Sequence, residues 1–132
     1  MQKVDRETAE REFDRFVEAM DLDGDSSEWD EDDRKGYDLQ KGKVISAIMS
    51  GSLVVNEDGE PVFNPTVDGD ALTFSEPTGA ALMAMDRKKK AEDMGKLFAM
   101  MAAITGVHPG TFAKMKNRDL KVCMAITTLF MG

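Results

Sequence analysis

The sequence predicts a mostly helical α+β fold, in which a small β-hairpin element packs on a C-terminal helical bundle. Three observations predict this class. Apolar side chains recur at helical spacing on both sides of the middle of the chain, residues 52–74 alternate instead and contain turn signals, and most acids precede residue 39. With 132 residues, 42% of them hydrophobic, the chain can bury one core of this size.

The first predicted element is a helix from Arg6 to Met20. Its apolar residues recur at the spacing of one helix face: Phe13, Phe16, Val17 and Met20. The next thirteen residues, Asp21–Asp33, hold eight acids and no base. Like charges at this density repel one another, so the segment is predicted to be a solvated linker.

The negative charge is concentrated in this part of the chain. Residues 1–38 carry 15 acidic and 6 basic side chains, whereas residues 39–132 carry 10 and 11, which together give the net charge of -8. We therefore predict a division into an acidic N-terminal helix and linker, residues 1–38, and a single globular domain, residues 39–132. The arm is expected to shield the domain or to steer basic partner segments.

A second helix is predicted from Tyr37 to Ser50, with Gly51 as its stop signal. Its apolar positions are Leu39, Val44, Ile45, Ile48 and Met49. A β-hairpin region, about residues 52–74, follows this helix. A helical bundle, about residues 77–131, completes the predicted domain.

The β-hairpin region contains three short β-like segments. Ser52–Asn56 is rich in β-branched residues, Glu57–Gly59 is a turn signal, and Glu60–Phe63 is predicted to return as the partner strand. Because Pro61 has no N–H to donate, this strand is expected at an edge of the sheet. Ala71–Phe74 alternates apolar and polar residues, as a half-buried strand does.

The bundle is predicted to contain a short helix at Ala80–Met85, a longer one at Ala91–Thr105, a brief turn or helix up to Met115, and a last helix after Asn117. Apolar residues of the longer helix share one face: Met94, Leu97, Phe98, Met101 and Ile104. The last helix is apolar on more than one side, so it needs cover from more than one neighbour.

Methionine is unusually frequent, with 11 residues in the chain, and eight of these lie from Met83 onward. Its unbranched, polarizable side chain adapts to irregular surfaces. We interpret the methionines of this half as core and adaptable contact surface together.

Composition argues against several classes of function. No apolar run approaches the roughly 18 residues needed to span a membrane, and no signal peptide is visible. One cysteine and one histidine argue against a disulfide framework, a zinc site or a nucleophilic triad. The net charge of -8 argues against nucleic-acid binding. We expect no cofactor, no membrane contact and no catalysis.

Candidate chemistry along the chain is weak. Asp21–Asp32 resembles a calcium loop, but Ser26, Glu28 and Asp32 depart from the template at three positions, so weak, nonspecific cation binding is favoured. Three other features are predicted to be structural: a solvated basic junction at Lys88–Lys90, a loop histidine at His108 and a core thiol at Cys123.

The order of several segments in the C-terminal half carries a family resemblance. Ala71–Gly79 ends in a Glu-Pro-Thr-Gly turn, the helix Gly95–Ile104 follows, and Thr105–Pro109 forms another turn. A last helix after Asn117 finishes in Leu129–Phe130. From about Leu53 to Gly132 the chain resembles the small tail assembly chaperones of long-tailed bacteriophages, typified by phages P2 and Mu. It departs from them at Ser75, where a basic residue is expected, and residues 1–50 have no counterpart.

The resemblance implies a non-catalytic chaperone that binds the phage tape measure protein and promotes tail tube assembly. The tail tube protein and a second copy of the chain are further candidate partners. Such a protein works in the host cell cytoplasm and is absent from the mature virion. The candidate contact residues form one set that serves both the core and the partner surface. They lie on the long C-terminal helices: Met94, Leu97, Phe98, Met101, Ile126 and Leu129. The alternative is an acidic regulatory binding module that responds to cations or mimics nucleic-acid charge.

Overall fold

A computed structural model describes residues 3–22, 30–65, 71–79, 93–108 and 110–131 of this chain. The helices are α1 (Arg6–Ala19), α2 (Glu31–Ser50), α4 (Asp93–Thr105), α5 (Gly110–Ala113) and α6 (Asn117–Met131). The strands are β1 (Leu53–Val55), β2 (Pro61–Phe63) and β3 (Leu72–Thr73), which form one antiparallel sheet. The predicted class, mostly helical α+β with a small β element, is confirmed.

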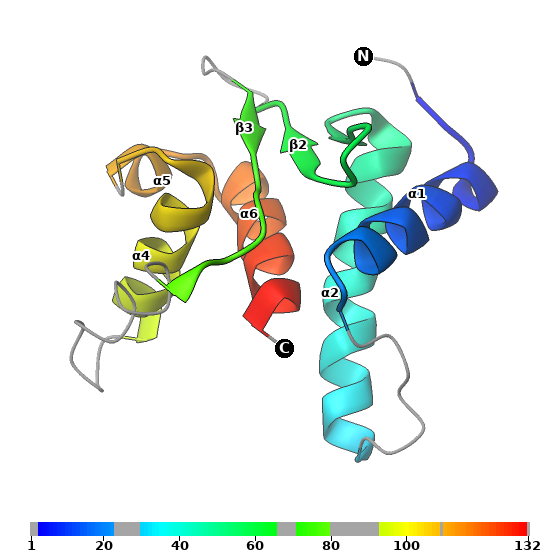
Figure 1. Ribbon diagram of the computed structural model, residues 1–132, viewed down its shortest axis with the longest axis horizontal. Helices are drawn as coiled ribbons and strands as arrows, with labels where there is room; N and C mark the ends of the chain where they lie inside the picture. Colours follow the sequence, from blue (N-terminus) through cyan, green and yellow to red (C-terminus); the bar gives the residue numbers. More distant parts are fainter. Residues whose placement is uncertain (1–2, 23–29, 66–70, 80–92, 109, 132) are drawn as a thin grey trace.

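The helices α2 and α6 pack against each other at the centre of the molecule. Figure 1 shows α1 crossing α2 on one side of this pair, and α4 and α5 beside α6 on the other. The sheet bridges the two sides, because β1 contacts α1 and α2 whereas β3 contacts α4. The N-terminal and C-terminal halves are therefore joined through both the helix pair and the sheet.

The first helix agrees with its prediction. Asp5 caps α1 by accepting a hydrogen bond from the backbone N–H of Thr8 at 2.8 Å. Hydrogen bonds from the side chain and the backbone of Thr8 lower the pKa of this carboxyl below its ordinary value of 3.8. The apolar stripe lies against the core, where Phe13 and Phe16 are buried.

The second helix begins earlier than predicted, at Glu31 rather than Tyr37. The carboxylate of Asp30 accepts a hydrogen bond from the backbone N–H of Asp33 at 2.8 Å and caps the helix. Acidic side chains also suit the positive end of a helix dipole, so the charges that suggested a linker stabilise a helix start instead. The predicted linker is therefore wrong over residues 30–33, and its residues 23–29 lie outside the described part.

The predicted stop of this helix is confirmed at Gly51, whose φ of 84° lies in the left-handed region that favours glycine. Its apolar positions are only partly as predicted. Val44, Ile45 and Ile48 are buried, whereas 58% of Leu39 is exposed. Tyr37, two residues earlier, packs its ring against Phe13 at 6.5 Å, so Leu39 is exposed because of the helix face that it occupies. Figure 1 shows the beginning of α2 extending past α1 and α6.

The strand pairing follows the predicted hairpin, with Leu53 opposite Phe63 in antiparallel register. The prediction that the strand containing Pro61 lies at an edge is wrong, because the sheet order is β1-β2-β3 and this strand is central. Pro61 is the first residue of β2, a position where a missing N–H is tolerated. Its carbonyl still takes part in the sheet, since it accepts a hydrogen bond from the N–H of Phe74 at 2.8 Å.

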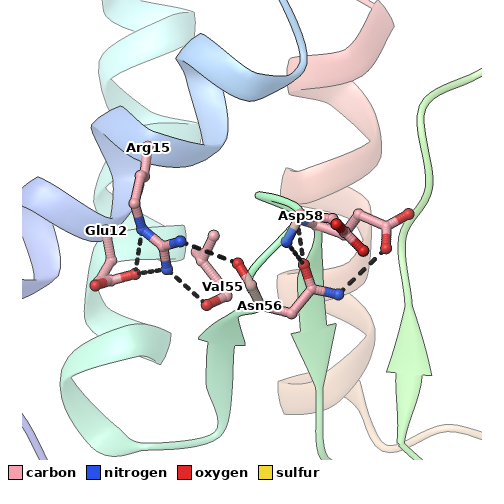
Figure 2. Close-up of polar contacts among 6 residues, drawn as sticks. Glu12, Arg15, Val55, Asn56 and Asp58 are labelled. Atoms are coloured by element: carbon pink, nitrogen blue, oxygen red, sulfur yellow. Dashed lines mark hydrogen bonds and ion pairs between the residues drawn. The ribbon is translucent and has the colours of Figure 1, made fainter.

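A guanidinium group joins α1 to the hairpin (Figure 2). Arg15 donates hydrogen bonds to the backbone carbonyls of Val55 at 2.8 Å and Asn56 at 3.0 Å. The carboxylate of Glu12, one turn earlier on α1, accepts from the same guanidinium and holds it in place. These carbonyls lie where β1 ends, so α1 is fixed to the start of the turn.

The turn itself is organised by Asn56, also shown in Figure 2. Its side-chain oxygen accepts from the N–H groups of Asp58 at 3.0 Å and Glu60 at 2.9 Å. Gly59 has a φ of 82°, and a Cβ added there would lie 2.1 Å from the Cβ of Ala19 on α1. Both the turn conformation and the close approach of α1 therefore require glycine at this position.

The core is continuous across these elements. Phe13 and Phe16 meet edge to face with ring centroids 6.0 Å apart, and Phe16 meets Phe130 of α6 at 5.4 Å. The largest side chains with less than 2% exposure come from both halves of the chain: Phe13, Phe16, Phe63, Phe74, Phe112, Ile45, Leu53, Met100, Met101, Ile126 and Val44.

Some sequence expectations are not tested. The helix expected at Ala80–Met85 and the basic run Lys88–Lys90 lie outside the described residues. The division of the chain at residue 38 stays a prediction, although α2 runs continuously through that position.

Candidate functional site

The six predicted contact residues lie on α4 and α6, two helices that pack against each other. Met101 and Ile126 are fully buried, and Leu129 is 7% exposed, so these three residues form core in the structure. Leu97 and Phe98 are half-buried and are the described members of the set that a partner could reach. Met94 lies in the first turn of α4, and its side chain is outside the described part.

A second surface, which we call the α2/α6 groove, was not predicted. It has a volume of about 780 Å³ and lies between the outer faces of α2 and α6. One wall comes from residues 38–50 of α2 and the other from residues 118–122 of α6. Its apolar lining comes from four side chains on three elements: Leu39, Ala47, Phe63 and Val122.

The polar lining of the groove holds four basic side chains, three serines and two acids. Arg6 lies at the start of α1, Lys43 on the α2 wall, and Arg118 and Lys121 on the α6 wall. Among the described residues, Lys43, Arg118 and Lys121 form no ion pair, whereas Arg6 pairs with Glu10 at 3.0 Å.

Two acids also line the groove. Asp38 is exposed, and Asp119 is 1% exposed and has interactions of its own. The accessible rim of the groove is therefore positive, although the whole chain carries a net charge of -8.

Sequence reasoning missed this groove because its two walls are about eighty residues apart in the chain. Apolar periodicity also assigned Leu39 to a buried helix face. One signal was present: Lys43 lies four residues after Leu39, which places both side chains on one helix face.

The remaining candidate groups are structural where the structure describes them. Burial, followed by the charge of Asp119, raises the pKa of the Cys123 thiol to about 12, so this thiol is unreactive near neutral pH. The ring of His108 is exposed, and its Nδ1 accepts a hydrogen bond from the N–H of Gly110 at 2.9 Å. Both residues agree with the structural roles predicted for them.

The calcium-like segment is described only at its two ends. Asp21 has a φ of 52°, and Asp30 caps α2, as described above. No group of three or more acidic, histidine or cysteine side chains arranged for a metal ion occurs among the residues whose positions are known. No helix in the same described ranges is long and apolar enough to cross a membrane.

Half-buried apolar side chains on α4 and an apolar groove with a basic rim are features of a protein that binds other proteins. Comparison with known families identifies the family of this protein. Residues 65–132 match the family of phage tail assembly chaperone proteins, E, or 41 or 14. The match covers half of the chain, and this protein belongs to that family.

Two other comparisons gave no match. No curated protein and no solved structure is significantly similar to this chain. The family match includes β3, α4, α5 and α6, together with all six predicted contact residues. The helices α1 and α2 and the hairpin β1–β2 precede it. Family membership identifies the chain as a phage tail assembly chaperone that acts on phage tail proteins.

Proposed function

We propose that this chaperone binds the phage tape measure protein and promotes assembly of the tail tube around it, without catalysing a reaction. The observation that carries the proposal is the family match over residues 65–132. This range holds every methionine from Met83 onward and the predicted contact residues.

The contact surface in this proposal is the α4/α6 pair. Leu97 and Phe98 offer apolar area that is partly open to a partner, and the buried Met101 and Ile126 support the helix that presents them. A long helical partner exposes many similar apolar segments, so its chaperone needs contacts that re-pack rather than one rigid fit. Methionine-rich helices provide such contacts at low steric cost.

The proposal includes a place and a time of action. The chaperone works in the host cell cytoplasm, where tails assemble, and it leaves before the virion is complete. The tail tube protein is a second partner that the bound chaperone recruits. No cofactor takes part, because binding and release of apolar segments need no chemical step.

Co-expression with the tape measure protein of the same phage tests the proposal. We expect the tape measure protein to remain soluble with this chain and to precipitate without it. The proposal is lost if its solubility is the same in both cases.

A pair of matched variants tests the contact surface. Leu97→Asp places a charge on half-buried apolar area of α4 and should reduce the amount of tape measure protein held in solution. Val54→Asp is the control, because Val54 is 51% exposed on β1 and lies outside the matched range. Circular dichroism of both variants verifies that each one folds. If folded Leu97→Asp holds as much tape measure protein in solution as the wild type does, α4 is excluded as the contact surface.

A further inference from the structure

The α2/α6 groove combines three properties that together specify an occupant. Leu39 is 58% exposed at one end of the groove, although it is a large apolar residue. Basic side chains stand on both walls, with Lys43 on α2 and Arg118 and Lys121 on α6. The lining of α2 runs from Asp38 to Ser50, a length of about 18 Å at the helical rise of about 1.5 Å per residue.

From these properties we propose that the α2/α6 groove binds an amphipathic helix whose apolar stripe is flanked by acidic residues. The stripe covers the exposed Leu39 and the half-buried Val122, above a floor formed by the buried Ala47 and Phe63, as apolar faces of helices do in other grooves. The flanking acids meet Lys43 on one wall and Arg118 and Lys121 on the other. Assigning this helix to the tape measure protein rests on the proposed function, whereas the chemistry of the groove does not.

Charge decides against two other occupants. A symmetric dimer through this groove would bring the same basic rims of two copies together, and like charges would oppose it. A nucleic acid needs an extended basic surface, whereas this groove has an apolar floor and an acid, Asp38, on its α2 wall. An amphipathic acidic helix supplies apolar side chains for the floor and acidic side chains for the basic rim.

Asp38 lines the groove itself, whereas the acids at the start of α2 lie far from its basic rim. Asp30, Glu31, Asp32 and Asp33 lie at the start of α2, and the ten residues from Asp33 to Lys43 span about 15 Å of helix. This exceeds the screening length of about 10 Å at 0.1 M salt. The positive rim therefore attracts a partner although the chain as a whole is acidic.

Two designed peptides test the proposal by fluorescence anisotropy. Both are about 18 residues long, because shorter isolated helices are marginal in water. They share one leucine stripe and differ only in its flanks, which are glutamate in one peptide and lysine in the other. We expect the acidic peptide to bind at least about tenfold more tightly at 0.1 M salt and to lose most of this advantage at about 1 M.

Matched variants locate the binding. Lys43→Glu with Lys121→Glu reverses one charge on each wall and should reverse the preference between the peptides. Lys3→Glu with Lys114→Glu makes the same change in net charge at exposed lysines outside the groove and should leave the preference intact. Leu39→Ala should weaken binding of both peptides alike, and its exposure makes the change harmless to folding.

Three results of the peptide assay would overturn the proposal. These are equal affinity for the two peptides, no binding of the acidic peptide, and the same response to the groove reversal and its control. If self-association of the chain competes with the acidic peptide, the groove binds a second copy of the chain, and this result would also overturn the proposal.

The tape measure protein separates this inference from the proposed function. If the wild-type chain keeps that protein soluble and the Lys43→Glu, Lys121→Glu variant does so equally well, the groove is not its site, yet the proposed function stands. If the acidic peptide binds but the tape measure protein is never held in solution, the proposed function fails and the groove remains a site for acidic helices.

Discussion

Phe16→Ala measures how strongly the N-terminal helix is built into the core. Phe16 is 1% exposed and meets the rings of Phe13 at 6.0 Å and Phe130 at 5.4 Å. Removing a buried phenylalanine ring costs about 3–5 kcal/mol, which includes the cavity that it leaves. We expect a loss of about 4 kcal/mol in the free energy of unfolding. With an unfolding entropy of about 2.1 cal/mol/K per residue, this loss lowers Tm by roughly 14 °C.

Urea denaturation followed by far-UV circular dichroism gives the free energy of unfolding. Glu18→Ala is the control, because Glu18 is exposed on the same helix and its removal should change stability by less than about 0.5 kcal/mol. If Phe16→Ala leaves too little folded protein to measure, Phe16→Leu makes a smaller change in the same direction. A loss below about 1 kcal/mol for Phe16→Ala would refute the reasoning. It would show instead that residues 1–38 form an arm separate from the domain.

Three other changes test particular contacts. Gly59→Ala should cost at least about 2 kcal/mol in unfolding free energy, because its φ is 82° and the added Cβ meets Ala19, whereas Ala19→Gly in the same chain should recover part of this loss. Arg15→Met should cost about 1 kcal/mol in the same assay, because two carbonyls lose a donor at a side chain that is 46% exposed. The Cys123 pKa is raised from 9.0 to about 12 by burial, so its contribution to stability is intact below pH 9 and is lost between pH 9 and 12. The free energy of unfolding, measured by urea denaturation at several pH values across this range, should fall less steeply for Cys123→Ala than for the wild type.

The periodicity of side chains was sufficient to predict most of the fold. The stripe containing Phe13 and Phe16 identified α1, and the glycine at position 51 identified the end of α2. These features are local, because each depends on residues within a few turns of one another. The hairpin β1–β2 was predictable for the same reason, since its turn signal and both strands lie within about a dozen residues.

The errors in the fold arose where one residue type has two physical roles. Acidic residues repel one another in a linker, but they also stabilise the start of a helix, and Asp30 takes the second role as the cap of α2. Proline is excluded from the middle of a central strand but tolerated at its first residue, where Pro61 stands. Composition alone does not distinguish these roles, because the position within the element decides between them.

The candidate surfaces also differ in how far the sequence could predict them. Leu97 and Phe98 were predicted as contact residues because they lie on one amphipathic helix, and both are half-buried in the structure. Burial of Met101 and Ile126 depends on how α4 and α6 pack, which helical spacing does not determine. The α2/α6 groove depends on contact between α2 and α6, so no local pattern could have revealed both of its walls.

The helix α2 carries two sets of side chains with separate duties. Val44, Ile45 and Ile48 hold the fold together, whereas Leu39 and Lys43 line the α2/α6 groove. Substitutions in the second set change the lining of the groove, while the first set keeps the helix in place. This wall also precedes the family match, whereas the α6 wall lies within it. The groove therefore joins a wall outside the matched family region to a wall inside it, so its lining can vary on the α2 side while the matched half of the molecule stays the same.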